Sequence, residues 1–279
     1  MNTSKFLTLI AGFRQSIGLK TDGTVIACGD NKYGQCNVSD WIDIISVSIA
    51  NTHTGNSHTL GLKKDGTVVS CGWNAYGQCD VQEWKDIVSI ETGWRTSFGI
   101  TKDGNVKATG RNHEEQCNVQ DWHNVILLSA GDWHTVGLTS DGKLLSTGNN
   151  RYGQCKIHDW INIKSLSAGY LHTLGLKSDG TVESTGINTY QQCDVSHWSN
   201  IIQISSGSHH SVGLKDDGTV IACGLNDDGQ CDVESWHDIV SISAGCSHTV
   251  GLKSDGTVVS TGSNKYHQCD TSNWINIKI

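Results

Sequence analysis

The sequence contains no proline in 279 residues, although average usage would supply roughly fourteen. Tight turns must therefore depend on glycine, asparagine and aspartate, and glycine is abundant at 32 copies. Hydrophobic residues make up only 36% of the chain, and no segment shows the periodicity of an amphipathic helix. These scarcities favour many short strands joined by turns over long core helices.

Positive charge and long apolar runs are also scarce. The formal net charge is −8, whereas unselective binding to phosphate backbones needs a basic field, so we expect no nucleic-acid partner. No apolar run approaches the length of a membrane span, so we expect no membrane contact. The opening "MNTSKFLTLIAG" lacks the basic and long apolar regions of a secretory signal. We therefore expect a cytoplasmic protein, with a mature secreted form as the alternative.

Eleven cysteines could indicate a disulfide framework, but their placement argues against one. Seven of them follow a glutamine at the same point of a repeat, namely Cys36, Cys79, Cys117, Cys155, Cys193, Cys231 and Cys269. An odd number of equivalent positions cannot all pair, and successive repeats hold them too far apart for a bond. We expect small, buried, reduced side chains.

Two sets of markers divide the chain into seven copies of one unit. Asp-Gly pairs begin at Asp22, Asp65, Asp103, Asp141, Asp179, Asp217 and Asp255. Tryptophans with the same spacing are Trp41, Trp84, Trp122, Trp160, Trp198, Trp236 and Trp274. The first interval is 43 residues and the other five are 38. The additional residues fall in "SIANTHTGNSHTL", which includes His53 and is either a partner-contacting loop or a neutral length variant.

One copy, "HTVGLTSDGKLLSTGNNRYGQCKIHDW", illustrates the expected strands. "HTVGL" alternates so that His134, Val136 and Leu138 share one side. The Asp-Gly pair predicts a tight type I′ hairpin, after which "KLLSTG" returns as the next strand. "NNRYGQC" is expected to be a loop, and one or two further strands should follow Trp160.

Short antiparallel strands repeated every 38 residues indicate the blades of an all-β, seven-bladed β-propeller. A solenoid is the competing arrangement, but it needs atypical polar end repeats, and the last repeat here resembles the others. The N-terminal "KFLTLIAG" matches the segment before an ordinary "HTVGL" frame, and the C-terminal "WINIKI" begins that same segment. We predict a single domain over residues 1–279, closed by pairing of its two terminal segments, and expect a monomer.

The repeat "AG-x-x-H-T-x-G-L-K-x-D-G-T-V" followed by "G-x-N-x-Y-G-Q" resembles that of the regulator of chromosome condensation family. Its short unit and its "GQCDV" spacing are still more similar to the propeller-type β-lactamase inhibitor proteins of the same superfamily. Both resemblances imply the propeller fold, and neither implies a single function.

Two pairs of variable positions per repeat, in "G-x-x-H" and in "G-x-N-x-Y", should lie on one face of the disc. The residues before the first strand of each hairpin and after its second strand lie at the same end, because the strands are antiparallel. Three tryptophans outside the structural spacing fall there, together with arginines and a tyrosine. The predicted partner-binding residues are Trp73, Trp94, Arg95, Arg111, Asp132, Trp133, Arg151 and Tyr170.

Tryptophan, tyrosine and arginine dominate interface hot spots, so we predict a non-catalytic, protein-binding propeller with an unidentified partner. Alternatively, the rings only cover the face or fill the central channel. The resemblances imply two specific forms: steric inhibition of a β-lactamase-like enzyme, with Trp73, Trp94, Trp133 and Tyr170 as contacts, or nucleotide exchange on a small GTPase. A glycan-binding propeller would repeat its tryptophan platforms blade by blade, which these positions do not.

Five histidines recur at one height of the ring: His58, His134, His172, His210 and His248. Gln15 and Thr96 occupy the same slot in the other copies, so buried, hydrogen-bonded side chains are expected rather than a metal site. No phosphate-cradling glycine loop, zinc-type Cys/His quartet or nucleophile with a base is evident. We expect no cofactor and no catalytic residue.

Overall fold

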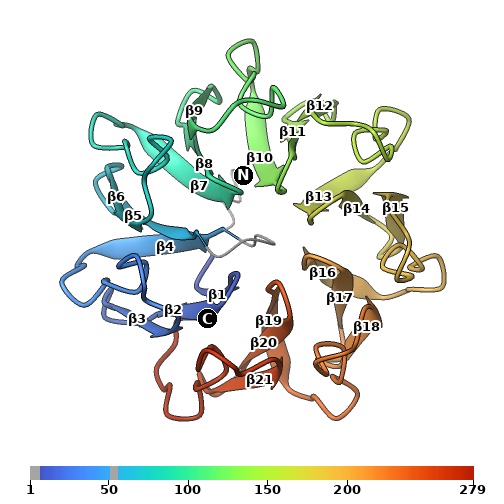
Figure 1. Ribbon diagram of the computed structural model, residues 1–279. Helices are drawn as coiled ribbons and strands as arrows, with labels where there is room; N and C mark the ends of the chain where they lie inside the picture. Colours follow the sequence, from blue (N-terminus) through green and yellow to red (C-terminus); the bar gives the residue numbers. More distant parts are fainter. Residues whose placement is uncertain (1–6, 51–55) are drawn as a thin grey trace.

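The computed structural model describes residues 7–50 and 56–279, and within them every regular element is a strand. The strands form seven three-stranded antiparallel sheets, which Figure 1 shows as blades around a central axis. The predicted seven-bladed β-propeller is therefore confirmed. Each repeat contributes one inner strand after its tryptophan, not two.

The inner strands are β1 (Leu9–Ala11), β4 (Ile44–Ile49), β7 (Ile87–Gly93), β10 (Val125–Ala130), β13 (Ile163–Ala168), β16 (Ile201–Ser206) and β19 (Ile239–Ala244). The middle strands are β2 (Gln15–Leu19), β5 (His58–Lys63), β8 (Thr96–Thr101), β11 (His134–Thr139), β14 (His172–Lys177), β17 (His210–Lys215) and β20 (His248–Lys253). The outer strands are β3 (Val25–Gly29), β6 (Val68–Gly72), β9 (Val106–Gly110), β12 (Leu144–Gly148), β15 (Val182–Gly186), β18 (Val220–Gly224) and β21 (Val258–Gly262). We number the blades in chain order, from blade 1 (β1–β3) to blade 7 (β19–β21).

The hairpin between middle and outer strands is correctly placed but is not of the predicted type. In blade 4, His134 pairs with Gly148 and Leu138 with Leu144. Only Gly142 has a positive φ in this turn, at 83°, whereas a type I′ turn needs two such residues. The Thr139 amide donates to the Lys143 carbonyl at 3.0 Å. This is a three-residue loop in which glycine follows a tight turn, so the aspartate accepts hydrogen bonds instead of adopting the left-handed conformation.

The two chain ends meet in blade 1, as predicted. Lys20 and Ile277 form an antiparallel bridge, and the Lys278 amide donates to the Leu19 carbonyl at 2.8 Å. Ile163 and Lys177 make the equivalent pair in blade 5, just before an irregularity in the strand register. The C-terminal segment thus provides the start of the inner strand of blade 1, and β1 provides the rest. The gap between the two chain ends falls at the position where the other blades already have an irregularity in strand pairing.

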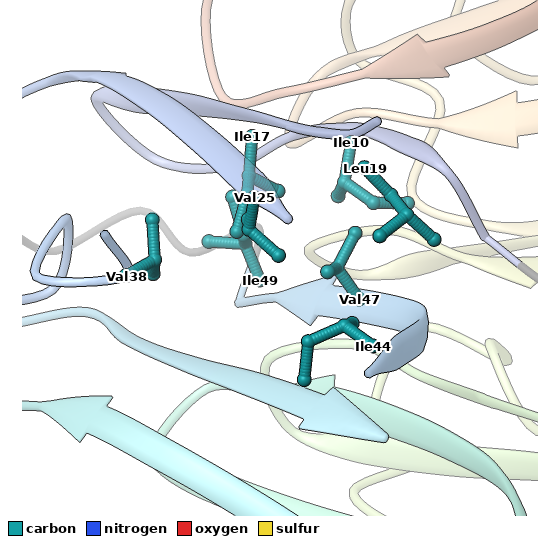
Figure 2. Packing of buried hydrophobic residues seen from close by; sticks show 8 residues of the cluster. All are labelled: Ile10, Ile17, Leu19, Val25, Val38, Ile44, Val47 and Ile49. Atoms are coloured by element: carbon teal, nitrogen blue, oxygen red, sulfur yellow. The ribbon is translucent and has the colours of Figure 1, made fainter. Parts of the chain in front are cut away.

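The core consists of seven apolar clusters, each lying between two neighbouring blades. Figure 2 shows the first, in which Ile17 and Leu19 of blade 1 face Ile44 and Val47 of blade 2. Each repeat tryptophan joins this packing. A Cβ atom on Gly137 would lie 2.8 Å from the Trp122 ring, so the glycine provides the space the indole fills. The prediction that these tryptophans pack between blades is confirmed.

The recurring histidines bridge neighbouring blades. His134 Nε2 lies 2.8 Å from the Thr173 hydroxyl of the next blade. That hydroxyl donates to the Gln154 carbonyl at 2.7 Å, so it accepts from a protonated Nε2. The same three-part link recurs at His58, His172, His210 and His248. All five rings are buried, and burial lowers the pKa of His134 to about 4 and that of His172 to about 3.

The inner strands would otherwise leave an edge of unpaired amides along the central channel. Side-chain oxygens of the adjacent blade accept from them instead. The Ser129 hydroxyl accepts from the Ala168 amide at 3.0 Å, and the Ser243 hydroxyl accepts from the Ala11 amide at 2.9 Å across the closure. These contacts tie the blades together at the axis and leave a cavity of about 120 Å³.

All eleven cysteines are free thiols, as predicted. The Cys155 thiol donates to the Asn149 carbonyl at 3.5 Å, and burial raises its pKa to about 11. The described residues include no helix with the length and apolarity to cross a bilayer. The predicted insertion around His53 lies outside the described residues.

The buried histidines should make the protein sensitive to acid. Each has a folded pKa below the 6.5 of an exposed histidine, so only the unfolded chain takes up the proton as the pH falls below 6.5. The free energy of unfolding should then decrease by about 1.4 kcal/mol per pH unit and per histidine, until the folded pKa is reached. H134Q, which copies the natural Gln15 slot, should reduce the difference in unfolding free energy between pH 7.5 and pH 4.5 by roughly 2.5 kcal/mol.

Urea unfolding at both pH values measures this difference. The matched control is H197Q, since His197 is exposed, and it should preserve the wild-type difference. An H134Q protein with the wild-type pH dependence would contradict the assignment of a neutral buried imidazole.

Candidate functional site

The variable positions lie on one face of the disc, as the hairpin geometry predicts. Because His134 pairs with Gly148, the loop between inner and middle strands lies beside the residues that follow the outer strand. The two are joined directly, since the Asn149 amide donates to the Trp133 carbonyl at 2.8 Å. We call this surface the loop face, and the opposite surface, with the Asp-Gly turns, the hairpin face.

The loops between inner and middle strands pack backbone against backbone around the axis. The Trp94 amide donates to the Gly131 carbonyl at 3.3 Å, and the Cys246 amide to the Gly12 carbonyl at 3.0 Å. A Cβ atom on Gly131 would lie only 2.2 Å from the Gly169 carbonyl oxygen, so this position must be glycine. The crowding forces side chains of neighbouring loops into mutual contact.

A continuous series of aromatic rings crosses the loop face from blade 3 to blade 6. Trp94 stacks on Trp133 with ring centroids 6.0 Å apart and an interplanar angle of 12°. Trp133 meets Tyr170 edge to face at 6.4 Å, and Tyr170 meets His209 in the same way at 5.3 Å. His209 also contacts Tyr190 at 5.1 Å. Tyr190 is 43% exposed and the other four rings are partly exposed, so the series forms a surface rather than a core.

Two arginines extend the series toward blade 2. The Arg95 guanidinium carbon lies 4.2 Å from the centroid of Trp94 and 4.7 Å from that of Trp73. The Arg111 guanidinium lies 4.7 Å from Trp94 and forms an ion pair with Glu114 at 2.8 Å. These geometries are those of cation–π contacts. Five of the predicted residues, Trp73, Trp94, Arg95, Arg111 and Trp133, therefore make one connected cluster, and Tyr170 continues it.

The other two predicted residues lie apart from this cluster in different ways. Asp132 is only 1% exposed, so its carboxylate lies below the surface instead of on it. Burial, followed by the charge of Asp132, raises the pKa of Tyr170. Arg151 is exposed, and its guanidinium carbon lies 5.8 Å from the centroid of the Tyr152 ring. Direct contact with a partner is thus geometrically open to Arg151 but closed to Asp132 in this conformation.

Sequence reasoning omitted four ring-bearing members of the surface. Tyr76 contacts Trp73 at 5.6 Å and His113 at 5.9 Å, and it accepts a hydrogen bond from Arg95 at 3.3 Å. Tyr190 and His209 are the other two. Both tyrosines belong to a slot that holds tyrosine in five of the seven repeats. These residues belong to the site because of the side chains that they contact on adjacent blades, which their position within the repeat does not reveal.

Throughout residues 7–50 and 56–279, no three His, Cys, Asp or Glu side chains are grouped so that they could hold an ion. The five recurring histidines instead use Nε2 for the hydroxyls of the next blade, which confirms their predicted hydrogen-bonded role.

Solved structures share this architecture at low sequence identity. The ectodomain of the Arabidopsis thaliana receptor kinase ACR4 superposes with a TM-score of 0.72 at 18% identity, covering 92% of this chain and 97% of that one. Yeast RCC1 (Prp20), solved with Kap60 bound, gives 0.70 at 17% identity, covering 100% and 86%. Human WBSCR16 gives 0.70 at 18%, covering 90% and 88%. Such identities show the shared fold alone. No curated protein sequence matches the chain.

The repeats themselves carry the family assignment. Segments 11–35, 44–78, 87–116, 125–154, 163–192, 201–230 and 239–268 each match the regulator of chromosome condensation (RCC1) repeat. The seven matched segments coincide with the seven blades and cover most of the chain. The protein therefore belongs to the RCC1 repeat family.

Proposed function

We propose that this protein is a non-catalytic binding propeller whose loop face docks a protein partner. The observation that carries the proposal is the connected cluster of partly exposed rings and guanidinium groups, which spans blades 2 to 6 on a single face. Monomeric proteins rarely maintain a contiguous patch of this kind without a use for it. The cluster is asymmetric around the ring, which favours one large partner over a small ligand repeated blade by blade.

The physical basis of binding would be pre-organisation. Trp94 and Trp133 already restrict each other by stacking, and Arg95 is held among three rings. Side chains that are ordered before docking lose little conformational entropy on docking, so burying them yields more net affinity. A rigid ring of blades beneath them adds to the same effect.

The fold relatives support a protein partner without identifying it. Prp20p of Saccharomyces cerevisiae, 17% identical with a TM-score of 0.67, is described for its binding to Gsp1p and histones, and another structure holds it with Kap60. The net charge of −8 argues against a polyanionic partner for this chain. Steric inhibition of a β-lactamase-like enzyme would use the same surface, by covering an active-site entrance.

Stability measurements can separate a binding surface from a structural cover. Trp133 is partly exposed, so W133A should cost only about 1 kcal/mol, mainly from lost ring contacts. Trp122 is 8% exposed and fills an inter-blade cluster, so W122A should cost about 3–5 kcal/mol. Thermal melts of both variants measure the contrast. Equal losses of Tm would show that the surface rings are structural.

Partner capture tests the proposed function directly. Wild-type protein carrying a cross-linker should capture a partner. The W94A/W133A variant should capture at least tenfold less of it, because both stacked rings are removed. The matched control I161A/I275A removes two aliphatic side chains that are 69% and 59% exposed, beside the hairpin face. It should retain the partner fully. Loss in the control, or equal capture by all three proteins, would reject the loop face as the binding surface.

A further inference from the structure

We propose that Arg95 forms a carboxylate-binding site on the loop face, which takes an aspartate or glutamate side chain of the protein partner. The inference rests on the proposed binding face and specifies the chemistry that the face selects. Three independent features of Arg95 support it: its backbone conformation, its surroundings and its lack of a counter-charge.

Arg95 has a left-handed backbone that the repeat does not require. Its φ is +60°. Within residues 7–50 and 56–279, ten other non-glycine residues have positive φ, and all belong to repeat positions. Seven are the Asp or Asn before each inner strand, namely Asp43, Asp86, Asn124, Asn162, Asn200, Asp238 and Asn276. Three, Glu115, Gln191 and His267, replace the glycine of the "YGQ" loop. Among the described residues with this backbone, Arg95 is the one that lies between an inner and a middle strand, and a left-handed conformation is less favourable for arginine than for glycine.

That conformation places the guanidinium among three rings. Its central carbon lies 4.2 Å from Trp94, 4.7 Å from Trp73 and 5.2 Å from Tyr76. One terminal nitrogen donates to the Tyr76 hydroxyl at 3.3 Å. The Nε atom is buried with no hydrogen-bond partner among the described residues. The charge is therefore partly removed from water, and among the described residues the Tyr76 hydroxyl accepts one hydrogen bond from the guanidinium.

The neighbouring Arg111 differs from Arg95 in having a counter-charge, although its Nη1 is likewise buried without a hydrogen-bond partner among the described residues. It lies on the same Trp94 ring and is neutralised by Glu114 at 2.8 Å. None of the ion pairs that the described residues form includes Arg95. Of the two arginines that lie against Trp94, Arg95 is therefore the one without an ion pair among the described residues.

A single unmatched guanidinium fits a singly charged carboxylate better than a phosphate. The planar fork of arginine matches the two oxygens of a carboxylate. A phosphate carries up to two charges and would need a second free cation, whereas Arg111 is already paired. The stacked Trp94 and Trp133 beside the site favour an acidic residue next to a large apolar one in the partner segment.

The site can be tested with small probes before the partner is known. The carboxylate probe is N-acetylglutamate N-methylamide, and its neutral isostere is N-acetylglutamine N-methylamide. Chemical shifts of the Arg95 Nε–H and of the Trp94 and Trp133 indole N–H groups report binding in nitrogen-15-labelled protein. We expect saturable shifts with the glutamate probe, with a Kd on the order of 1–10 mM, and no saturation with the glutamine probe.

Variants connect the response to Arg95. R95Q should abolish the indole shifts, and R95K should weaken binding at least fivefold, because lysine keeps the charge but not the fork. K32Q removes an exposed cation of the same face, in the loop after β3, and should bind like the wild type. The retained charge in R95K keeps the test informative if R95Q folds poorly.

Three outcomes would overturn the inference. These are equal shifts with the glutamine probe, a wild-type response in R95Q or R95K, and tighter binding of inorganic phosphate than of the glutamate probe. Failure here is distinct from failure of the proposed function. If W94A/W133A loses its partner while R95Q retains it, the binding face stands and the carboxylate site does not.

Discussion

Packing between neighbouring blades is the constraint on which this structure depends. A three-stranded sheet has two faces and too little area to bury either by itself, so each blade must cover its neighbours. The seven apolar clusters lie at the seven blade interfaces, including the one that joins Leu9 and Ala11 to Val250 and Leu252 of the last blade. Closure of the ring is therefore part of the core, and the Lys20–Ile277 bridge completes it.

The polar contacts between blades follow the same rule. Each hydroxyl such as that of Thr173 serves two groups of the preceding blade, a histidine Nε2 and a glutamine carbonyl. Apolar packing has little directional preference, whereas these bonds require one relative position of the two blades. The histidine rings, the hydroxyls and the glycines beside them consequently recur together in the repeat.

The repeated residues of each blade supply the packing and the hydrogen bonds that the fold needs, so the remaining positions can differ from one repeat to the next. The loops on the loop face meet through their backbones, so their variable side chains can change without disturbing the blades. Trp94 and Trp133 belong to different repeats, but the ring brings them into a stack. The asymmetry of the face thus arises on a nearly symmetric support, which is how a repeat array can acquire one specific surface.

The repeat spacing, the alternation within "HTVGL" and the matching terminal segments were sufficient to predict seven blades, the closure in blade 1 and a common face for the variable residues. Local pattern determines these features, because each depends on strand period and on contacts that recur in every copy. The hairpin type was wrong, since the turn is defined by a backbone hydrogen bond between Thr139 and Lys143 that "DG" alone does not specify. Only the tertiary structure decided which variable side chains touch, and it added Tyr76 and His209 to the surface. It also decided that Asp132 is buried and that Arg95 adopts a left-handed conformation without a counter-ion among the described residues. These properties depend on the distance between adjacent loops, which is set by how closely the blades pack and not by any residue's own position in the repeat.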